Sequence, residues 1–163
     1  MTAHPEISAY RVEKLRRPAT IMLSSGEAVD GSFFLAHASA HHPGPERVGE
    51  LLNAEPGFFP FELRGEDTPR TVLLNRAEVL TVRLSDDEAK HEPGYDVATP
   101  HLVAIGLSRG PRLMGEVRVY GPGGHDRLSD WTRDPEPFRY LECGRETLLV
   151  NMRHVIDVSE ALR

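Results

Sequence analysis

The chain has 163 residues, of which 39% are apolar and 27% are charged, as is common in soluble globular proteins. This length allows one domain or two small ones. The formal net charge of −6 argues against a protein that binds nucleic acids or membrane surfaces through general positive charge. No apolar run approaches the roughly 20 residues that span a bilayer, so we expect no membrane association.

A single cysteine, Cys143, excludes a disulfide bond within the chain and favours a reducing compartment. The N-terminal segment lacks the apolar region of a signal peptide, and we therefore expect a cytoplasmic protein. Arginine is the main cation. Residues 101–163 balance nine acids with nine arginines, whereas residues 19–84 carry nine acids and five arginines.

The chain divides into two similar copies with short flanking segments. Residues 1–18 form a lead-in, which we predict as a short helix or an extended segment ended by Pro18. Residues 19–84 and 101–163 are the first and second copies. Residues 85–100 are acidic, contain a Pro-Gly pair and lack an apolar period, which is typical of a linker.

Two glycines recur at a fixed distance. Gly26 and Gly31 are matched by Gly110 and Gly115, each 84 positions later. The first glycine of each pair lies in a turn between two predicted strands, and the second lies where the following strand bends too closely for a side chain. A phosphate-binding loop is a poorer interpretation, because these glycines join two strands rather than a strand and a helix.

A second motif recurs 80 positions apart, at residues 46–58 and 126–138. Apolar residues at helical spacing predict a short helical or irregular segment in each copy. We expect Leu51 and Trp131 to close one end of the core there. An alternating strand follows in each copy, and Pro60 restricts the first of these strands to an edge or a bulge.

Each copy ends with a strand, a tight turn and a last strand, at residues 71–82 and 147–158. Asn75 and Asn151 occupy the same place before the turn, 76 positions apart. The distance between equivalent residues falls along the chain because the loops of the second copy are shorter. Loops tolerate such changes, whereas the strands are retained.

The closing segments LLNRAEVLTV and LVNMRHVIDV resemble the joint between the fourth and fifth strands of SH3-like and Sm-like barrels. The openings SGEAVDG and RGPRLMG are similar to the first turn of Sm-like proteins. This resemblance implies a mainly β fold with two tandem five-stranded barrels over residues 19–84 and 101–160. The helical segment follows the second strand instead of preceding the first. Neither copy carries the Asp-x-x-apolar-Asn loop with which Sm proteins bind RNA.

His37, His41 and His42 lie in one loop and are weak candidates for a metal site, because histidine is a common metal ligand. A structural zinc site usually needs four ligands, and no second cluster accompanies these histidines. A solvated loop is the preferred interpretation. We expect no metal or other cofactor.

Four residues are candidates for ligand binding. Asn75 and Asn151 could present two symmetric amides, although an asparagine that caps the turn is the simpler interpretation. Arg127 could bind a phosphate, or could pair with Asp130 as Arg47 could with Glu50. Trp131 could stack on a base if it were exposed, but a core position is favoured.

No segment has the pattern of a catalytic motif. The sequence therefore favours a non-catalytic binding or assembly module with a protein partner, which could be a second copy in a homodimer. The alternative is RNA or nucleotide binding through the arginine-rich second copy, which we do not favour. An enzyme is the least favoured interpretation.

Overall fold

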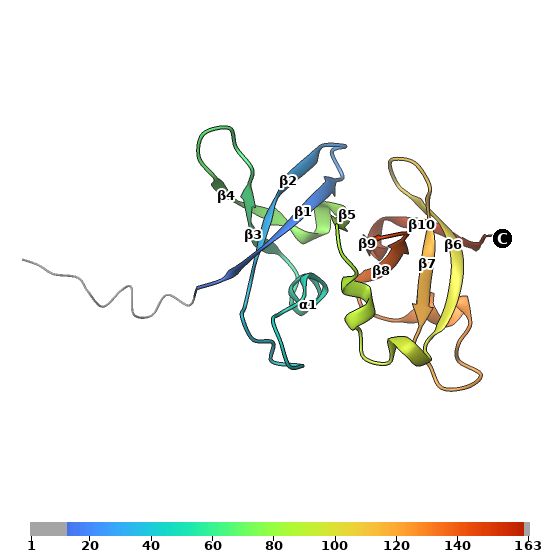
Figure 1. The fold of residues 1–163 in the computed structure, drawn as a ribbon. Helices are drawn as coiled ribbons and strands as arrows, with labels where there is room; N and C mark the ends of the chain where they lie inside the picture. The colour runs from blue at the N-terminus through green and yellow to red at the C-terminus, as the bar shows by residue number, and fades with distance from the viewer. Residues whose placement is uncertain (1–12, 162–163) are drawn as a thin grey trace, which may run out of the picture.

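A computed structural model of the protein describes residues 13–161, so residues 1–12 of the predicted lead-in, residues 1–18, lie outside this range. The described residues form ten strands, two short α-helices and four 3-10 turns, and Figure 1 shows their arrangement. In chain order the elements are β1 (Leu15–Leu23), β2 (Ala28–Leu35), α1 (Val48–Ala54), β3 (Phe58–Leu63), β4 (Arg70–Asn75), η2 (Arg76–Glu78), β5 (Val79–Leu84), η3 (Glu88–His91), η4 (Tyr95–Val97), β6 (Thr99–Leu107), β7 (Leu113–Val119), α2 (Leu128–Arg133), β8 (Phe138–Cys143), β9 (Glu146–Asn151), η5 (Met152–His154) and β10 (Val155–Glu160).

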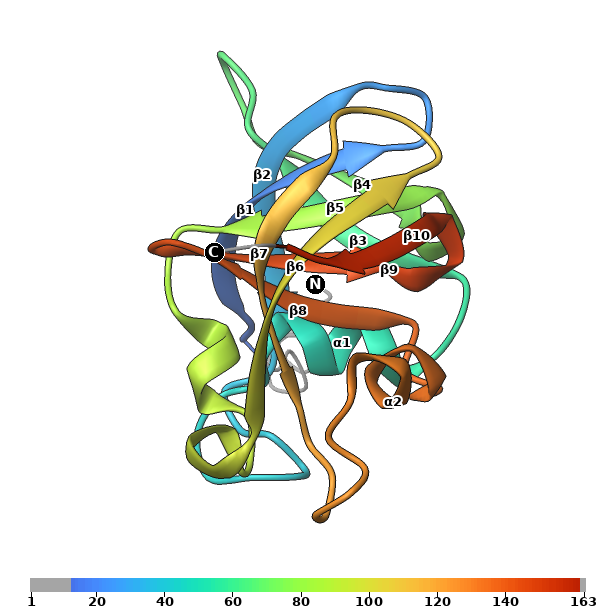
Figure 2. The same cartoon turned by 90° about the vertical axis from the view of Figure 1, so that its right-hand side faces the viewer.

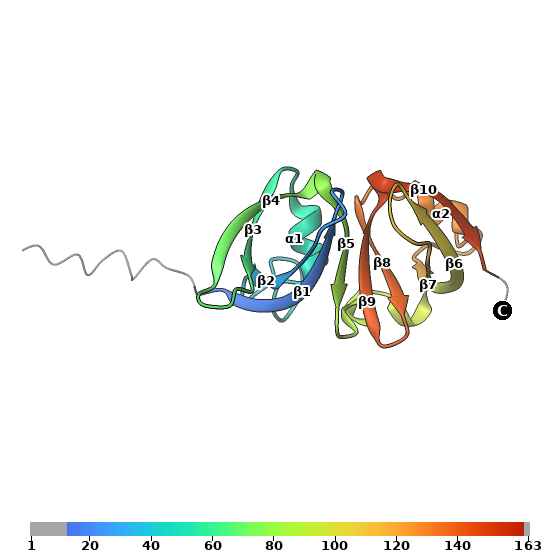
Figure 3. The same ribbon diagram turned by 90° about the horizontal axis from the view of Figure 1, so that it is seen from above.

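All ten strands belong to one antiparallel sheet, in the order β10-β6-β7-β8-β9-β5-β1-β2-β3-β4. The predicted mainly β fold is confirmed, but the prediction of two closed barrels is wrong. Within each half the fifth strand pairs with the first, and the fourth strand lies at the opposite end of that half from the fifth. The halves are joined because β9, the fourth strand of the second half, pairs with β5, the fifth strand of the first. Figure 3 shows the two curved halves meeting at β5 and β9. The sheet stays open because this pairing joins the halves instead of closing either one.

The strand registers match in the two halves at the glycines that recur 84 positions apart. Ala19 lies opposite Gly31 in the first half, and Val103 lies opposite Gly115 in the second, 84 positions later in both strands. A Cβ atom on Gly115 would lie 2.6 Å from the carbonyl oxygen of Glu142, and one on Gly31 would meet the carbonyl oxygen of Glu62 even more closely. Both glycines are therefore required where the neighbouring strand crosses, as the sequence predicted.

Both predicted helical segments form, and Figure 2 shows α1 and α2 on the same side of the strands. Trp131 of α2 is buried as predicted. In α1 the fully buried apolar residues are Val48 and Leu52, whereas Leu51 is only partly buried. The prediction that Leu51 closes the core is therefore wrong, and the neighbouring Leu52 is the buried leucine. Each half has its own apolar core beneath its helix.

Two prolines lie where only one side of a strand is paired. Pro18 does not end the lead-in as predicted, because β1 begins at Leu15 and Pro18 lies opposite Ser32 of β2. Pairing of β1 with β5 starts only at Thr20, so the missing N–H of proline faces no strand. Pro60 pairs with Leu73 on one side only, which confirms the predicted edge-like position.

The predicted linker, residues 85–100, joins the halves and also packs against them. It forms η3 and η4, and β6 begins within it. The buried carboxylate of Glu88 accepts hydrogen bonds from the backbone N–H of Val48 at 3.0 Å and from the Tyr140 hydroxyl at 2.8 Å. This segment therefore connects α1 of the first half to β8 of the second.

Candidate functional site

The junction of β5 and β9 is the largest contact between the two halves. Thr81 lies opposite Val150 and Val82 lies opposite Leu149. Leu149 and Phe138 belong to the second half, yet they pack in the apolar core of the first. The junction is thus a continuous part of the core and not a loose contact between two units.

Asn151 extends this junction through its buried side chain. Its Nδ2 donates hydrogen bonds to the carbonyl oxygens of Arg76 at 3.2 Å and Val79 at 2.9 Å, both in the first half. Its Oδ1 accepts a hydrogen bond from the backbone N–H of Arg153 at 3.0 Å and so caps η5. Asn151, predicted as a ligand-binding candidate, lies at the junction, and its side-chain amide forms hydrogen bonds with backbone groups.

Asn75 has the same local role in the first half. Its Oδ1 accepts from the backbone N–H of Ala77 at 3.1 Å and caps η2, so the capping interpretation is supported for both asparagines. Asn75 is only partly buried, because it lies at the end of the edge strand β4. Within the described residues its Nδ2 has no hydrogen-bond partner.

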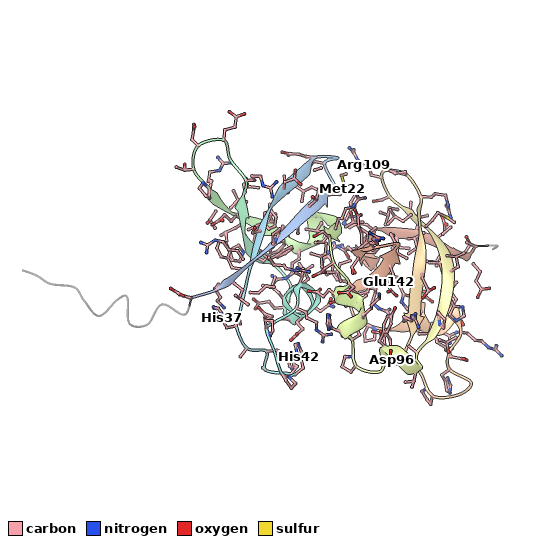
Figure 4. The ribbon with its side chains drawn as sticks, viewed as in Figure 1. Met22, His37, His42, Asp96, Arg109 and Glu142 are labelled. Atoms are coloured by element: carbon pink, nitrogen blue, oxygen red, sulfur yellow. The ribbon has the colours of Figure 1, made fainter. Side chains whose placement is uncertain are left out.

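Other hydrogen bonds also connect the two halves near the junction. The side-chain amide of Asn53 on α1 forms two hydrogen bonds with the backbone of Phe138. Its Nδ2 donates to the carbonyl oxygen at 3.0 Å, and its Oδ1 accepts from the N–H at 2.8 Å. At the top of the junction, Nη1 of Arg109 donates to the carbonyl of Ser25 at 2.8 Å (Figure 4). These contacts connect helix α1 and the two glycine turns across the halves.

A groove with a volume of about 320 Å³ opens beside the junction. The end of α1, the loop before β3, and the turns η2 and η5 line it, and they supply Asn53, Arg76 and Arg153. Arg76 is buried, which lowers its pKa, and its guanidinium donates to the carbonyl oxygens of Phe58 and Leu51. The Nε of Arg76 is buried without a hydrogen-bond partner among the described residues.

A narrower cleft of about 60 Å³ lies over β7 and β8 and contains Trp131 in its wall. The guanidinium of Arg139 covers the Trp131 ring at 4.7 Å, so this ring is not exposed for stacking on a base. The Tyr95 hydroxyl donates to Glu142 at 2.6 Å and accepts from Arg118 at 3.1 Å. Burial and the nearby Glu142 raise the pKa of Tyr95 to about 12, so it stays protonated at neutral pH.

The histidine loop is held to α1 by Glu50. The Glu50 carboxylate accepts hydrogen bonds from the Ser39 hydroxyl at 2.7 Å and from His42. His37 and His41 are exposed, and Figure 4 shows His37 and His42 at separate positions in this region. Between residues 13 and 161 no group of three potential ligands could hold a metal ion.

Arg127 is exposed at the start of α2. Its backbone N–H donates to Asp130 Oδ2 at 3.0 Å, and the N–H of Arg47 donates to Glu50 in the same way at 3.1 Å. The recurring acid therefore caps the first turn of each helix, the shared structural role that its spacing indicated. The Asp130 side chain pairs with Arg133 instead of Arg127, at 3.6 Å.

The structure does not gather the four predicted ligand residues into one site. Asn151 lies at the junction, Asn75 at the β4 edge, Trp131 in the core and Arg127 on the surface. Sequence reasoning missed three large exposed apolar residues near the two ends of the sheet: Leu73 on β4, Ile156 on β10 and Phe58 at the start of β3. Aligning the copies by their 76- and 80-residue spacing could have identified them, because their counterparts are core residues.

Across the described range, no helix is long and apolar enough to cross a membrane. Comparisons with models of known protein families, with curated proteins and with solved structures found no match to this chain.

Proposed function

We propose that the chain is a non-catalytic assembly module that binds other polypeptides by adding strands to the two edges of its sheet. Each half is then one SH3- or Sm-like unit whose fourth and fifth strands serve assembly instead of closing a barrel. The observation that carries this proposal is that β4 and β10, at the two ends of the sheet, each pair with only one strand among residues 13–161. Each edge exposes a large apolar side chain, Leu73 on β4 and Ile156 on β10.

An exposed apolar edge strand is unusual in a protein that acts alone. Unpaired N–H and C=O groups on an edge are a template for another strand, and monomeric proteins commonly block them with lysine, proline or a very short strand. β4 and β10 each have six residues and contain neither lysine nor proline. These edges are therefore suited to bind a strand through backbone hydrogen bonds, with Leu73 and Ile156 adding apolar contact.

The ionisable side chains of the enclosed regions support a non-catalytic role. Glu50 is held by Ser39, His42 and Arg47, and these contacts fix the loop before α1. Glu142 lines the cleft of about 60 Å³ and accepts a hydrogen bond from the Tyr95 hydroxyl. Both groups have a structural partner that accounts for their position.

A peptide with the sequence of residues 144–154, which contains β9, tests strand addition directly. β9 pairs with β5, and β10 is the equivalent of β5, so the peptide should bind the β10 edge. The Leu73→Lys protein is used because its own β4 edge is disabled. NMR should show shifts of the backbone amides of residues 155–160. The same peptide carrying Leu149→Lys is the control, and the absence of shifts with the unmodified peptide would contradict the proposal.

A second candidate function, RNA or nucleotide binding, is favoured by the groove beside the junction. Arg153 is exposed there, Arg76 has a buried N–H without a partner, and neither forms an ion pair with another described residue. In contrast, Arg112, Arg118 and Arg139 of the second half are paired with carboxylates. The groove is thus a better phosphate site than the arginine-rich surface as a whole.

Fluorescence anisotropy with a labelled single-stranded RNA tests this second function. Binding should weaken steeply as salt concentration rises, because phosphate contacts release counterions. Arg153→Gln should reduce both the affinity and the salt dependence, whereas Arg133→Gln, which removes an arginine already paired with Asp130, should change them little. Equal effects of the two substitutions would exclude the groove.

A further inference from the structure

We propose that the β4 edge of one chain pairs with the β10 edge of a second copy, in the register of the internal β5–β9 junction. This inference rests on the proposed function, because it names the strand that binds each edge. β9 and β4 are the fourth strands of the two halves, and β5 and β10 are the fifth. The chain makes a fourth-to-fifth junction once internally and leaves one complementary edge at each end of the sheet.

The exposed apolar residues of the edges are the counterparts of residues buried at the internal junction. Leu73 is 66% exposed, and Leu149, 76 positions later, is 0% exposed. Ile156 is 70% exposed, whereas Leu80, 76 positions earlier, is 1% exposed. Phe58 is 62% exposed, and its counterpart Phe138, 80 positions later, is 2% exposed. Leu73, Ile156 and Phe58 are thus large apolar residues that would be buried only if a second junction formed.

The internal register specifies which residues would face each other between two copies. Val82 lies opposite Leu149 in the chain, and the equivalent pair is Val158 of one copy opposite Leu73 of the other. By the same transfer, Phe58 would approach the core of the second half, as Phe138 enters the core of the first. The outer strands therefore match in length and in the positions of their apolar side chains.

Asn75 supplies a polar contact of the same kind. Asn151 donates to two carbonyl oxygens of the first half across the internal junction, at Arg76 and Val79. Asn75 caps its turn as Asn151 does, but its Nδ2 has no partner among the described residues. In the proposed junction this Nδ2 faces the equivalent carbonyl oxygens of the second copy, at Met152 and Val155.

The charges of the edges favour pairing of unlike strands. Arg70 is the only charged residue of β4, whereas β10 carries Asp157 and Glu160. Pairing of β10 with β10 would bring two acidic strands together, and pairing of β4 with β4 would offer no acidic residue to Arg70. β4 against β10 combines opposite charges, as Arg83 of β5 and Glu146 of β9 do at 3.3 Å across the internal junction.

Such a contact is head-to-tail, because two different surfaces meet. Repeated by every copy, it produces a closed ring if the rotation between neighbours closes and an open filament if it does not. In contrast, a two-fold dimer joined through a single pair of strands would need the same edge from both chains. The two arrangements therefore differ in which edges pair, and not only in the number of chains in the assembly.

Light scattering after size-exclusion chromatography of two edge variants tests the inference. Leu73→Lys disables the β4 edge and Ile156→Lys disables the β10 edge, and both side chains are exposed in the single chain. Wild-type protein should form rings or filaments, and each variant alone should be monomeric. An equimolar mixture should form a heterodimer, because the intact β10 edge of Leu73→Lys meets the intact β4 edge of Ile156→Lys.

Met114→Lys is the matched control, since Met114 is an exposed apolar residue on the interior strand β7 and should leave assembly unchanged. A variant that dimerises alone would overturn the head-to-tail arrangement, as would a mixture that stays monomeric. Wild-type protein that is monomeric at its highest soluble concentration would overturn self-assembly. If the β9 peptide still bound β10 in that case, strand addition would stand and only the second copy as partner would be excluded.

Discussion

Leu149 and Leu73 occupy equivalent positions in the two halves and differ almost completely in exposure. Leu149 of β9 lies opposite Tyr140, and Leu73 of β4 lies opposite Pro60, the equivalent residue 80 positions earlier. Leu149 is 0% exposed because β5 covers it, whereas Leu73 is 66% exposed because no described strand follows β4. The same residue type at the same site thus belongs to the core in one half and to a free edge in the other.

Truncation of these two leucines should have very different effects on the stability of the single chain. Leu149→Ala should lower the free energy of unfolding by about 2–5 kcal/mol, because it leaves a cavity in a packed core. Leu73→Ala should change it by less than about 0.5 kcal/mol, as expected of an exposed residue. Both are measured by urea denaturation in the Ile156→Lys background, where assembly is blocked. Similar losses for the two variants would show that Leu73 is buried within the single chain.

Alanine at Gly31 or Gly115 should destabilise the protein by about 1–3 kcal/mol, the usual range for forcing an extra carbon into a packed site. Each new Cβ would collide with a carbonyl oxygen of the neighbouring strand, at Glu62 or Glu142. Gly123→Ala is the control, because a Cβ there meets nothing within 4 Å. Thermal unfolding followed by circular dichroism compares the three variants. A Gly31→Ala protein as stable as Gly123→Ala would disprove the close approach of these strands.

Asn151→Ala should cost about 1–3 kcal/mol of stability, because it leaves buried carbonyl groups of Arg76 and Val79 without their donor. Asn75→Ala removes only the bond that caps η2 and should cost about 1 kcal/mol in an assembly-deficient background. Chemical denaturation measures both. In the assembling protein, Asn75→Ala should in addition weaken association. A stability loss for Asn75→Ala equal to that for Asn151→Ala would contradict the different roles assigned to them.

Glu50 should make the stability depend on pH in the acidic range. Burial alone raises its pKa, but hydrogen bonds from Ser39, His42 and Arg47 outweigh burial and lower the pKa from 4.5 to about 2. A carboxyl group with a lowered pKa in the folded state stabilises the fold fully above its unfolded pKa, and this contribution is lost as the pH falls through the folded pKa.

The free energy of unfolding of the wild type should therefore fall more steeply between about pH 4.5 and about pH 2 than that of Glu50→Gln. Denaturation midpoints at a series of pH values measure the two slopes. Glu27→Gln, in the exposed turn between β1 and β2, serves as the control and should keep the wild-type slope. Parallel curves for the wild type and Glu50→Gln would show that these hydrogen bonds do not hold the carboxylate in solution.

The local features of the fold could be predicted from the sequence because they depend on nearby residues. Gly31 and Gly115 were identified as sites of close strand approach, and the two helical segments, the strands that follow them and the turns capped by asparagine were located. The repeat itself supplied much of this information, since each element was seen twice. Pro18 was misread because its tolerance in β1 depends on where β5 begins to pair.

The pairing of the halves could not be predicted, because the alternating pattern of a strand is the same for every neighbour it can have. Nothing in β5 alone distinguishes pairing with β4, which would close a barrel, from pairing with β9. For the same reason Leu73 and Ile156 resemble core residues in the sequence. Only the registers of the folded sheet show that Leu73 and Ile156 lack a partner strand among the described residues, whereas Leu149 and Leu80 have one.

A disulfide between two copies tests the second junction at the level of single residues. Leu73→Cys and Val158→Cys are combined in a Cys143→Ser background, so that the two new thiols face each other only between chains in the proposed register. Cα atoms of directly opposed residues lie about 4.5–5.5 Å apart, within the range that a disulfide spans. Mild oxidation should link the chains into covalent oligomers, whereas Leu73→Cys with Asp157→Cys, displaced by one residue, should link poorly. Protein that stays monomeric on denaturing gels with the first pair would contradict the pairing of β4 with β10.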